Sequence, residues 1–148
     1  MASVHVEGWR QTYGPLLPDG YINDEVIAAK VALWEALTAN PSPERALQIA
    51  ERRGAIIGLA FAGPTLPDEA EPKRPLSLHA LYVLSAHHGT GVGQQLLEGV
   101  LGNQPAELWV AVENPRAQAF YRRNGFDSDG VTRVDEDTPG LPVMRMLR

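Results

Sequence analysis

The 148-residue sequence contains no cysteine. The absence of thiols excludes a disulfide scaffold, a thiolate metal site and a cysteine nucleophile. Long apolar runs are also missing, because no stretch approaches the roughly 20 residues that cross a bilayer. The first residues lack the basic-then-apolar order of a secretory signal. We therefore expect a cytoplasmic protein with no membrane partner and no metal centre.

Positive charge is scarce as well. The chain carries 13 basic and 18 acidic residues, a net charge of −5, and its pI is near 5.3. This balance argues against nucleic acid as the main partner and is compatible with an enzyme acting on a cationic organic substrate. With 44% of its residues in the hydrophobic class, a chain of this length can bury a substantial core. We expect one domain over residues 1–148.

The most informative stretch runs from residue 76 to residue 93. Leu76 to Leu84 is typical of a buried strand, since it is short, rich in large apolar residues and preceded by Pro75. From Val92 the apolar residues recur at helical spacing as far as Gly102. A glycine-rich turn lies between the two. A strand, a glycine turn and a helix start place free backbone N–H groups at one point, which predicts an anion site suited to phosphate.

The glycines of this turn alternate at positions 89, 91 and 93. Glycine permits positive φ and lets the backbone approach a ligand. An ordinary turn between strand and helix is the alternative reading. The pattern is not a Walker loop, because no Gly-Lys-Ser/Thr follows. It is not the strict dinucleotide fingerprint either, although Glu113 could mimic the ribose-binding acid of that motif.

Two helices and an antiparallel pair of strands are predicted before residue 76. The first helix runs through Trp9 to Tyr13 and ends at Gly14-Pro15; the second begins after Asn23 as N-cap, with an apolar face that includes Leu33 and Trp34. Strands are predicted at residues 45–51 and 55–62, joined by a turn at 52–54. Residues 63–75 hold four prolines and the acidic run 68–71, which predicts a loop with solvated acids.

The C-terminal part begins with an apolar strand at residues 107–112. Asn114 as N-cap, Pro115 at the first helical position and Gly125 just past the end predict a short helix. Together with the strand at residues 76–84 and the helix from Val92, the strand at residues 107–112 completes a parallel β-α-β unit. Two further strands are expected at residues 126–134 and 141–147, joined by an acidic turn.

Two motifs together resemble those of the GNAT superfamily of acyl-CoA-dependent N-acyltransferases. His88-Gly-Thr-Gly-Val-Gly93 resembles the pyrophosphate loop of that family, and residues 114–126 resemble its second CoA motif. The opening helix with Trp9 and Tyr13 also resembles a branch of small-molecule acetyltransferases. The resemblance covers nearly the whole chain. It implies an α+β, three-layer fold in which a mixed, mostly antiparallel sheet of about six strands is flanked by four helices.

The resemblance also implies roles for individual residues. Tyr121 becomes the candidate general acid, with aromatic packing beside Phe120 as the alternative. The resemblance implies that the backbone of Leu81, Tyr82 and Val83 contacts the pantetheine and the acetyl carbonyl. The remaining residues implied to bind acetyl-CoA are His88, Gly89, Thr90, Gly91, Val92, Gly93, Gln94, Asn114, Ala117, Phe120 and Tyr121. Trp9, Tyr13 and Trp34 are candidates for an aromatic substrate pocket, with core packing as the alternative.

Three departures from the family pattern stand out. His88 occupies a position where many relatives carry Arg or Gln, and Ser77 occupies the position of a catalytic Glu on the central strand. His79 is the substitute base that we expect, because it shares a strand face with Ser77 and Leu81; Glu113 and a water-mediated route remain open. Relatives usually begin with a strand before the first helix. We therefore expect an incomplete sheet edge, with a homodimer as one way to cover it.

Three functions compete at this point. The leading hypothesis is an N-acetyltransferase that acts from acetyl-CoA on a primary amine of a small molecule or peptide, by direct attack in a ternary complex. The second is a catalytically weak acyl-CoA-binding or regulatory module. The third is a nucleotide-binding β-α-β protein, which is disfavoured because only about 60 residues follow the turn, too few for a dinucleotide fold.

Overall fold

The computed structural model describes residues 1–66, 71–135, 138 and 140–148. Positions 68–70 of the predicted acidic run and positions 136, 137 and 139 of the predicted acidic turn lie outside these ranges. Within them the chain forms six strands, four α-helices and two short 3₁₀ helices. No helix in the described ranges is long and apolar enough to cross a membrane.

The elements follow the predicted order along the chain. The helices are α1 (Ala2–Tyr13), α2 (Asp24–Ala39), α3 (Val92–Leu101) and α4 (Pro115–Arg123), with 3₁₀ turns η1 (Gly14–Leu16) and η2 (Ser85–His87). The strands are β1 (Ala46–Arg52), β2 (Ala55–Pro64), β3 (Leu76–Val83), β4 (Glu107–Ala111), β5 (Asp127–Val134) and β6 (Pro142–Leu147).

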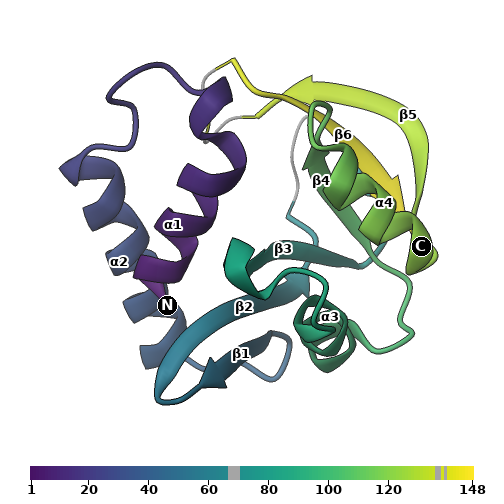
Figure 1. Ribbon diagram of the computed structural model, residues 1–148. Helices are drawn as coiled ribbons and strands as arrows, with labels where there is room; N and C mark the ends of the chain where they lie inside the picture. Colours follow the sequence, from purple (N-terminus) through teal and green to yellow (C-terminus); the bar gives the residue numbers. More distant parts are fainter. Residues whose placement is uncertain (67–70, 136–137, 139) are drawn as a thin grey trace.

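One mixed sheet carries the whole fold, in the order β1-β2-β3-β4-β6-β5 (Figure 1). All neighbours are antiparallel except β3 and β4, which form the predicted parallel pair. The predicted mostly antiparallel sheet is thus confirmed. The same finding excludes the doubly wound parallel sheet that a dinucleotide-binding protein would need.

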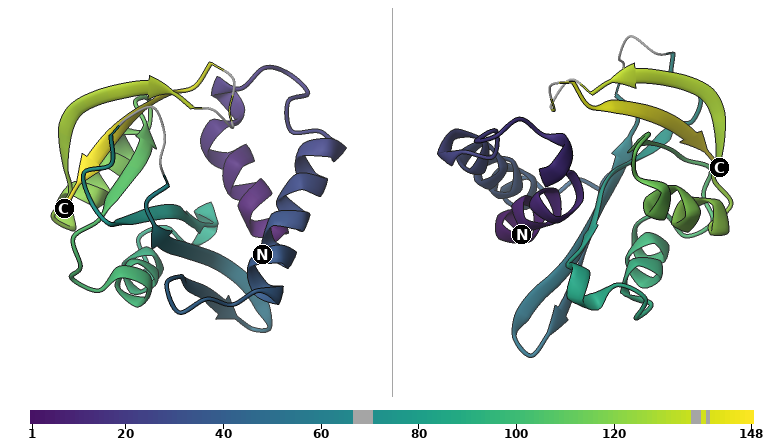
Figure 2. Two further views of the ribbon diagram at one scale, coloured as in Figure 1. Left: turned by 180° about the vertical axis from the view of Figure 1, so that it is seen from behind. Right: turned by 45° about the horizontal axis from the view of Figure 1, so that its top comes forward.

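Helices cover both faces of the sheet. Helices α1 and α2 lie on one face, and α3 and α4 lie on the other (Figure 2). Helix α3 gives the larger core its apolar ridge through Leu96, Leu97, Val100 and Leu101, which pack with Phe126 and Met146. A smaller cluster joins α1 and α2 to β2 and β3 through Val4, Trp34, Leu59 and Ala80. Burying these apolar side chains is the main driving force for the three-layer arrangement.

Helix α2 differs from the prediction on its apolar face. Trp34 is its buried residue, whereas the side chains of Val31 and Leu33 are 38% and 42% exposed. The reason is that Leu33 lines an open cavity instead of packing into the core. The N-cap prediction is confirmed, since the Asn23 side chain accepts a hydrogen bond from the Val26 N–H at 3.0 Å.

Close packing of α1 on the sheet depends on Gly8. A Cβ built at this position would lie 2.9 Å from Cδ1 of Tyr82. No side chain larger than hydrogen fits there without a shift, so Gly8 lets α1 approach β3 at Tyr82. The aromatic residues of α1 are thereby brought close to the middle of the sheet.

The central strand β3 is irregular at His79. Phe61 of β2 pairs with Ala80, but the next residue, Ala62, pairs with Leu78, so His79 is the extra residue of a β-bulge. Beyond the single pair Ser77 and Glu107, no further pairing of β3 with β4 occurs in the described residues, and Figure 1 shows the two strands diverging. A bulge and an opened strand pair are devices that create a site inside a sheet.

In the described residues β1 is an edge strand of the sheet. Among the described residues β1 pairs only with β2, and the Ile49 side chain of β1 is 46% exposed. A partner chain at this edge stays a prediction.

Candidate functional site

Two cavities meet where β3 and β4 diverge. The larger has a volume of about 750 Å³ and lies toward α1 and α2; the smaller has a volume of about 360 Å³ and lies toward α3 and α4. Six residues line both cavities: Tyr13, Leu78, His79, Ala80, Tyr82 and Trp109. The two cavities therefore lie next to each other at the β3 bulge.

The smaller cavity contains the glycine turn before α3. Gly89 and Gly91 adopt φ values of +74° and +85°, a conformation that glycine adopts without strain. Gly91 is the N-cap of α3, and no side chain caps this helix start. The first N–H groups of a helix lack intrahelical acceptors and carry the positive end of the helix dipole. The turn therefore offers a backbone anion site at the mouth of this cavity.

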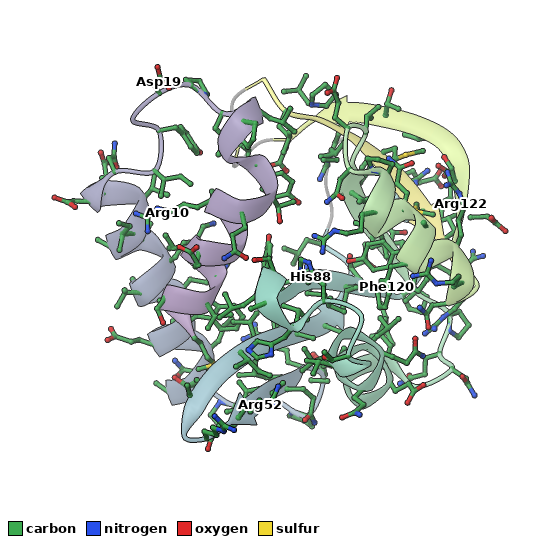
Figure 3. The ribbon with its side chains drawn as sticks, viewed as in Figure 1. Arg10, Asp19, Arg52, His88, Phe120 and Arg122 are labelled. Atoms are coloured by element: carbon green, nitrogen blue, oxygen red, sulfur yellow. The ribbon has the colours of Figure 1, made fainter. Side chains whose placement is uncertain are left out.

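His88 and Arg116 lie together beside that turn. His88 Nε2 lies 2.8 Å from the Val83 carbonyl oxygen and 2.7 Å from Nη1 of Arg116. His88 Nδ1 contacts Nη1 of Arg116. In the view of Figure 3 the exposed residue His88 lies near the middle of the picture, between α1 and Phe120, whereas Arg122 points outward. Arg116 lines this cavity and brings a permanent positive charge to it.

Helix α4 closes the smaller cavity. Asn114 Oδ1 accepts the N–H of Ala117 at 3.1 Å, as predicted for an N-cap. Tyr121 packs edge-on against Phe120 and Phe126, with ring centroids 5.3 and 5.9 Å away. Burial, with a smaller contribution from Tyr13, raises the pKa of Tyr121 well above its ordinary value. The Tyr121 phenol consequently keeps its proton at any physiological pH.

The larger cavity has aromatic walls. Trp9, Tyr13 and Trp34 all line it, together with Phe61 and Trp109. Trp9 Nε1 donates to the Tyr82 hydroxyl at 2.8 Å. Burial and the charge of Asp135 raise the pKa of Tyr13 to about 12. This cavity suits an organic molecule with an apolar body.

His79 stands at the junction of the two cavities. Its ring stacks on Phe61 with centroids 5.2 Å apart, and its Nε2 lies 3.2 Å from the Pro64 carbonyl oxygen. Because that oxygen can only accept, Nε2 carries the proton and Nδ1 is left as the basic nitrogen. The ring is solvent-accessible, yet the protein around it partly desolvates it and lowers its pKa below the ordinary value. His79 is therefore mainly neutral at pH 7.

The bulge changes which residues of β3 lie on the same face of the sheet as His79. Ser77 and His79 both line the larger cavity, but Leu81 packs into the core cluster beneath α3. The expectation that these three residues share a face is wrong for Leu81, because the extra residue in β3 breaks the alternation of side chains.

The structure gathers most of the predicted cofactor residues in one place. Those lining the smaller cavity are Leu81, Tyr82, Val83, His88, Gly89, Gly91, Gly93, Gln94, Asn114, Ala117, Phe120 and Tyr121. Thr90 and Val92 do not line it; the Thr90 hydroxyl instead donates to the His87 carbonyl at 2.7 Å. Glu113, the other candidate base, lines neither cavity.

Sequence reasoning missed three residues of the site. Arg116 and Trp109 line the cavities, and His5 lies in the floor of the larger one. Arg116 sits inside the α4 motif two residues after its N-cap, which is a usable signal. The placement of His5 and Trp109 depends on long-range packing that their local sequence does not reveal.

Comparisons with known proteins agree on one family. Residues 43–128, more than half of the chain, match the family model described as an acetyltransferase (GNAT) domain. An uncharacterized N-acetyltransferase of Mycobacterium tuberculosis is 34% identical over 94 residues, which cover 60% of this chain and 56% of that protein. The chain thus spans little more than half the length of that relative. The uncharacterized N-acetyltransferase YuaI of Bacillus subtilis is 27% identical over 100% of this chain and 89% of its own.

Solved structures with the same fold cover nearly the whole chain. The PaiA N-acetyltransferase of Thermoplasma acidophilum, solved with coenzyme A, has a TM-score of 0.67 at 20% identity, over 97% of this chain and 88% of that one. The protein PH1933 of Pyrococcus horikoshii has a TM-score of 0.71 at 20% identity, over 99% and 88% of the two chains.

Proposed function

The chain belongs to the GNAT acetyltransferase family, and from that premise we propose that it transfers the acetyl group of acetyl-CoA to a primary amine held in the larger cavity. The observation that carries the proposal is the meeting of the two cavities at the β3 bulge, with His79 in the wall of both. One cavity takes the acyl donor and the other takes the amine, so the two react in a ternary complex.

The smaller cavity fits an acyl-CoA in three respects. The uncapped start of α3 and the charge of Arg116 suit a pyrophosphate. Beyond Ser77, β3 has no described strand neighbour on its β4 side, so its backbone groups there are available to a pantetheine arm. The Thermoplasma relative of the same fold was solved with coenzyme A. When bound, acetyl-CoA supplies an acetyl thioester.

His79 is the base of the proposed reaction. An amine attacks a thioester only as the free base, so one proton must leave the amine nitrogen as the new C–N bond forms. His79 Nδ1 accepts this proton, since Nε2 is already protonated toward the Pro64 carbonyl. The lowered pKa keeps Nδ1 unprotonated before the reaction. Unpaired N–H groups of β3 stabilise the negative charge that grows on the acyl oxygen.

Tyr121 assists departure of the sulfur. Its raised pKa lies above that of an ordinary thiol, so the phenol donates a hydrogen bond to the leaving thiolate instead of giving up its proton fully. The C–S bond breaks, the thiolate takes a proton from solvent, and His79 returns its proton to solvent.

The proposal is tested by the pH dependence of thiol release from acetyl-CoA in the presence of a panel of primary amines. Because protonation of His79 removes the base, kcat/KM should fall as the pH drops through a pKa below 6.5. The amide of His79→Gln can still donate to the Pro64 carbonyl. For this variant we expect kcat/KM to be lower by about 10²-fold or more, and we expect no fall of kcat/KM at acidic pH with this pKa.

Circular dichroism and the melting temperature of His79→Gln serve as the folding control. If the variant folds and shows the wild-type kcat/KM with the same decrease at acidic pH, His79 is not the base. Acetyl-CoA binding without transfer to any amine would favour the acyl-CoA-binding module instead.

A further inference from the structure

His5 is a buried histidine that the proposed reaction does not use. It lies on α1, is 5% exposed, and lines the larger cavity. Its ring is stacked on Tyr82 with centroids 4.6 Å apart, and it meets Trp9 and Trp34 edge-on. Its Nε2 atom is buried and has no hydrogen-bond partner in the described part of the chain. A buried polar atom without a partner calls for an explanation.

The hydrogen bond at the other ring nitrogen determines which nitrogen carries the proton. Trp34 Nε1 donates to His5 Nδ1 at 3.0 Å, and an indole N–H can only donate. Nδ1 is therefore unprotonated, and the proton of the neutral ring lies on Nε2. Burial and the charge of Lys30 lower the pKa of His5 to about 3. His5 thus presents a neutral N–H donor throughout the physiological pH range.

Two other donors accompany this N–H group. The Tyr82 hydroxyl oxygen accepts from Trp9, and its own hydrogen has no acceptor among residues 1–66, 71–135, 138 and 140–148. Lys30 Nζ lies 4.4 Å from the centroid of the Trp9 ring, which itself is 5.5 Å from His5. Lys30 lines the same cavity. The aromatic wall therefore gathers N–H, O–H and ammonium donors, a set that complements an anion.

We infer that this wall binds a carboxylate, and that the acceptor substrate is an amine carrying a carboxylate group at a distance from its amino group. The inference rests on the proposed function and names the substrate class of that same cavity. The carboxylate accepts from His5 Nε2–H and Tyr82 O–H and pairs with Lys30, while the amino end lies toward His79. Because Nε2 is shielded from solvent, side chains around it must shift when the carboxylate enters.

The test compares 4-(aminomethyl)benzoate with 4-(aminomethyl)benzamide, two aromatic amines that differ only in the charged end. The wild-type protein should favour the carboxylate by about tenfold or more in kcat/KM, since a charged hydrogen-bonded group is recognised more strongly than its neutral isostere. Lys30→Met should bring the ratio close to one. Lys73→Met removes the only other lysine of the chain, outside both cavities, and should keep the preference.

A second readout does not depend on turnover. In the wild-type protein the ¹⁵N-detected Nε2–H resonance of His5 should shift when 4-(aminomethyl)benzoate is added without acyl-CoA, and should not shift with the amide. A shift without any acetyl transfer would support the carboxylate site while removing the proposed reaction. Transfer to both amines at equal kcat/KM, with no shift of that resonance, would overturn the inference and leave the proposed reaction intact.

Discussion

At the residue scale, burial sets the protonation states of Tyr121, Tyr13, His79 and His5. Tyr121 and Tyr13 are held as phenols because burial raises their pKa values. His79 and His5 are held neutral because burial lowers theirs. At pH 7 these four side chains therefore supply neutral donors and, in His79, a neutral base, which amine acylation needs.

Tyr121→Phe tests the role of one hydroxyl. No hydrogen bond of the Tyr121 hydroxyl is found among the described residues, and the ring packs against Phe120 and Phe126. The variant should therefore keep the wild-type melting temperature within a few degrees. We expect kcat to fall by about 10²-fold through loss of the hydrogen bond to the leaving sulfur, with little change in the Kd for acetyl-CoA. An unchanged kcat in steady-state kinetics would leave Tyr121 as a packing residue.

At the element scale, local chemistry predicted the elements well where caps and breakers are strong. Asn23, Asn114 and Pro115 mark helix starts that the structure confirms, because a cap acts within one turn. The β3 bulge at His79 could not be predicted in this way. It depends on the register between β2 and β3, and register is a property of two strands.

The divergence of β3 from β4 is likewise invisible in either strand alone. The sequence predicted a parallel β-α-β unit, and the pair exists, but only at Ser77 and Glu107. The Glu107 side chain binds the segment that precedes β3, because its Oε2 accepts hydrogen bonds from the backbone N–H groups of Lys73 and Arg74 at 2.7 and 2.9 Å. The motifs of the candidate site are local and could be predicted from the sequence. The two neighbouring cavities depend on contacts between distant segments, so they could not be predicted in this way.

The glycine turn gives a matched pair of variants. Gly91 and Gly130 have φ values of +85° and +84°, and a Cβ at either would meet nothing within 4 Å. Gly91→Ala and Gly130→Ala should each lose about 1 kcal/mol of unfolding free energy, because an alanine is strained at positive φ. Only Gly91→Ala should also weaken acetyl-CoA binding, since its methyl group enters the anion site.

Chemical denaturation and calorimetric titration of both variants measure the two effects separately. Equal acetyl-CoA affinities in the two variants would mean that the turn before α3 does not hold the ligand.

At the scale of the whole molecule, His5 links stability to pH. Its pKa is 6.5 when unfolded and about 3 when folded, so below pH 6.5 the unfolded chain binds a proton that the folded chain rejects. The stabilisation from the neutral ring is complete above pH 6.5 and is lost as the pH falls toward 3. Between pH 6.5 and 5.5 the free energy of unfolding should fall by about 1 kcal/mol through this group.

His5→Gln isolates that contribution, because its amide oxygen can still accept the Trp34 N–H but does not titrate. Urea unfolding at pH 6.5 and 5.5 should show a smaller loss for the variant than for the wild-type protein. The same loss in both proteins would mean that His5 is able to take up a proton in the folded state.

The most direct test of whether the smaller cavity binds an acyl-CoA is calorimetric titration with acetyl-CoA. The proteins to compare are the wild type, Arg116→Gln and Arg122→Gln. Both arginines lie on α4, but only Arg116 lines the smaller cavity. We predict that the wild-type protein and Arg122→Gln bind acetyl-CoA equally, and that Arg116→Gln binds about tenfold more weakly through loss of a phosphate contact. No binding by the wild-type protein, or equal binding by all three, would contradict the assignment of this cavity to an acyl-CoA.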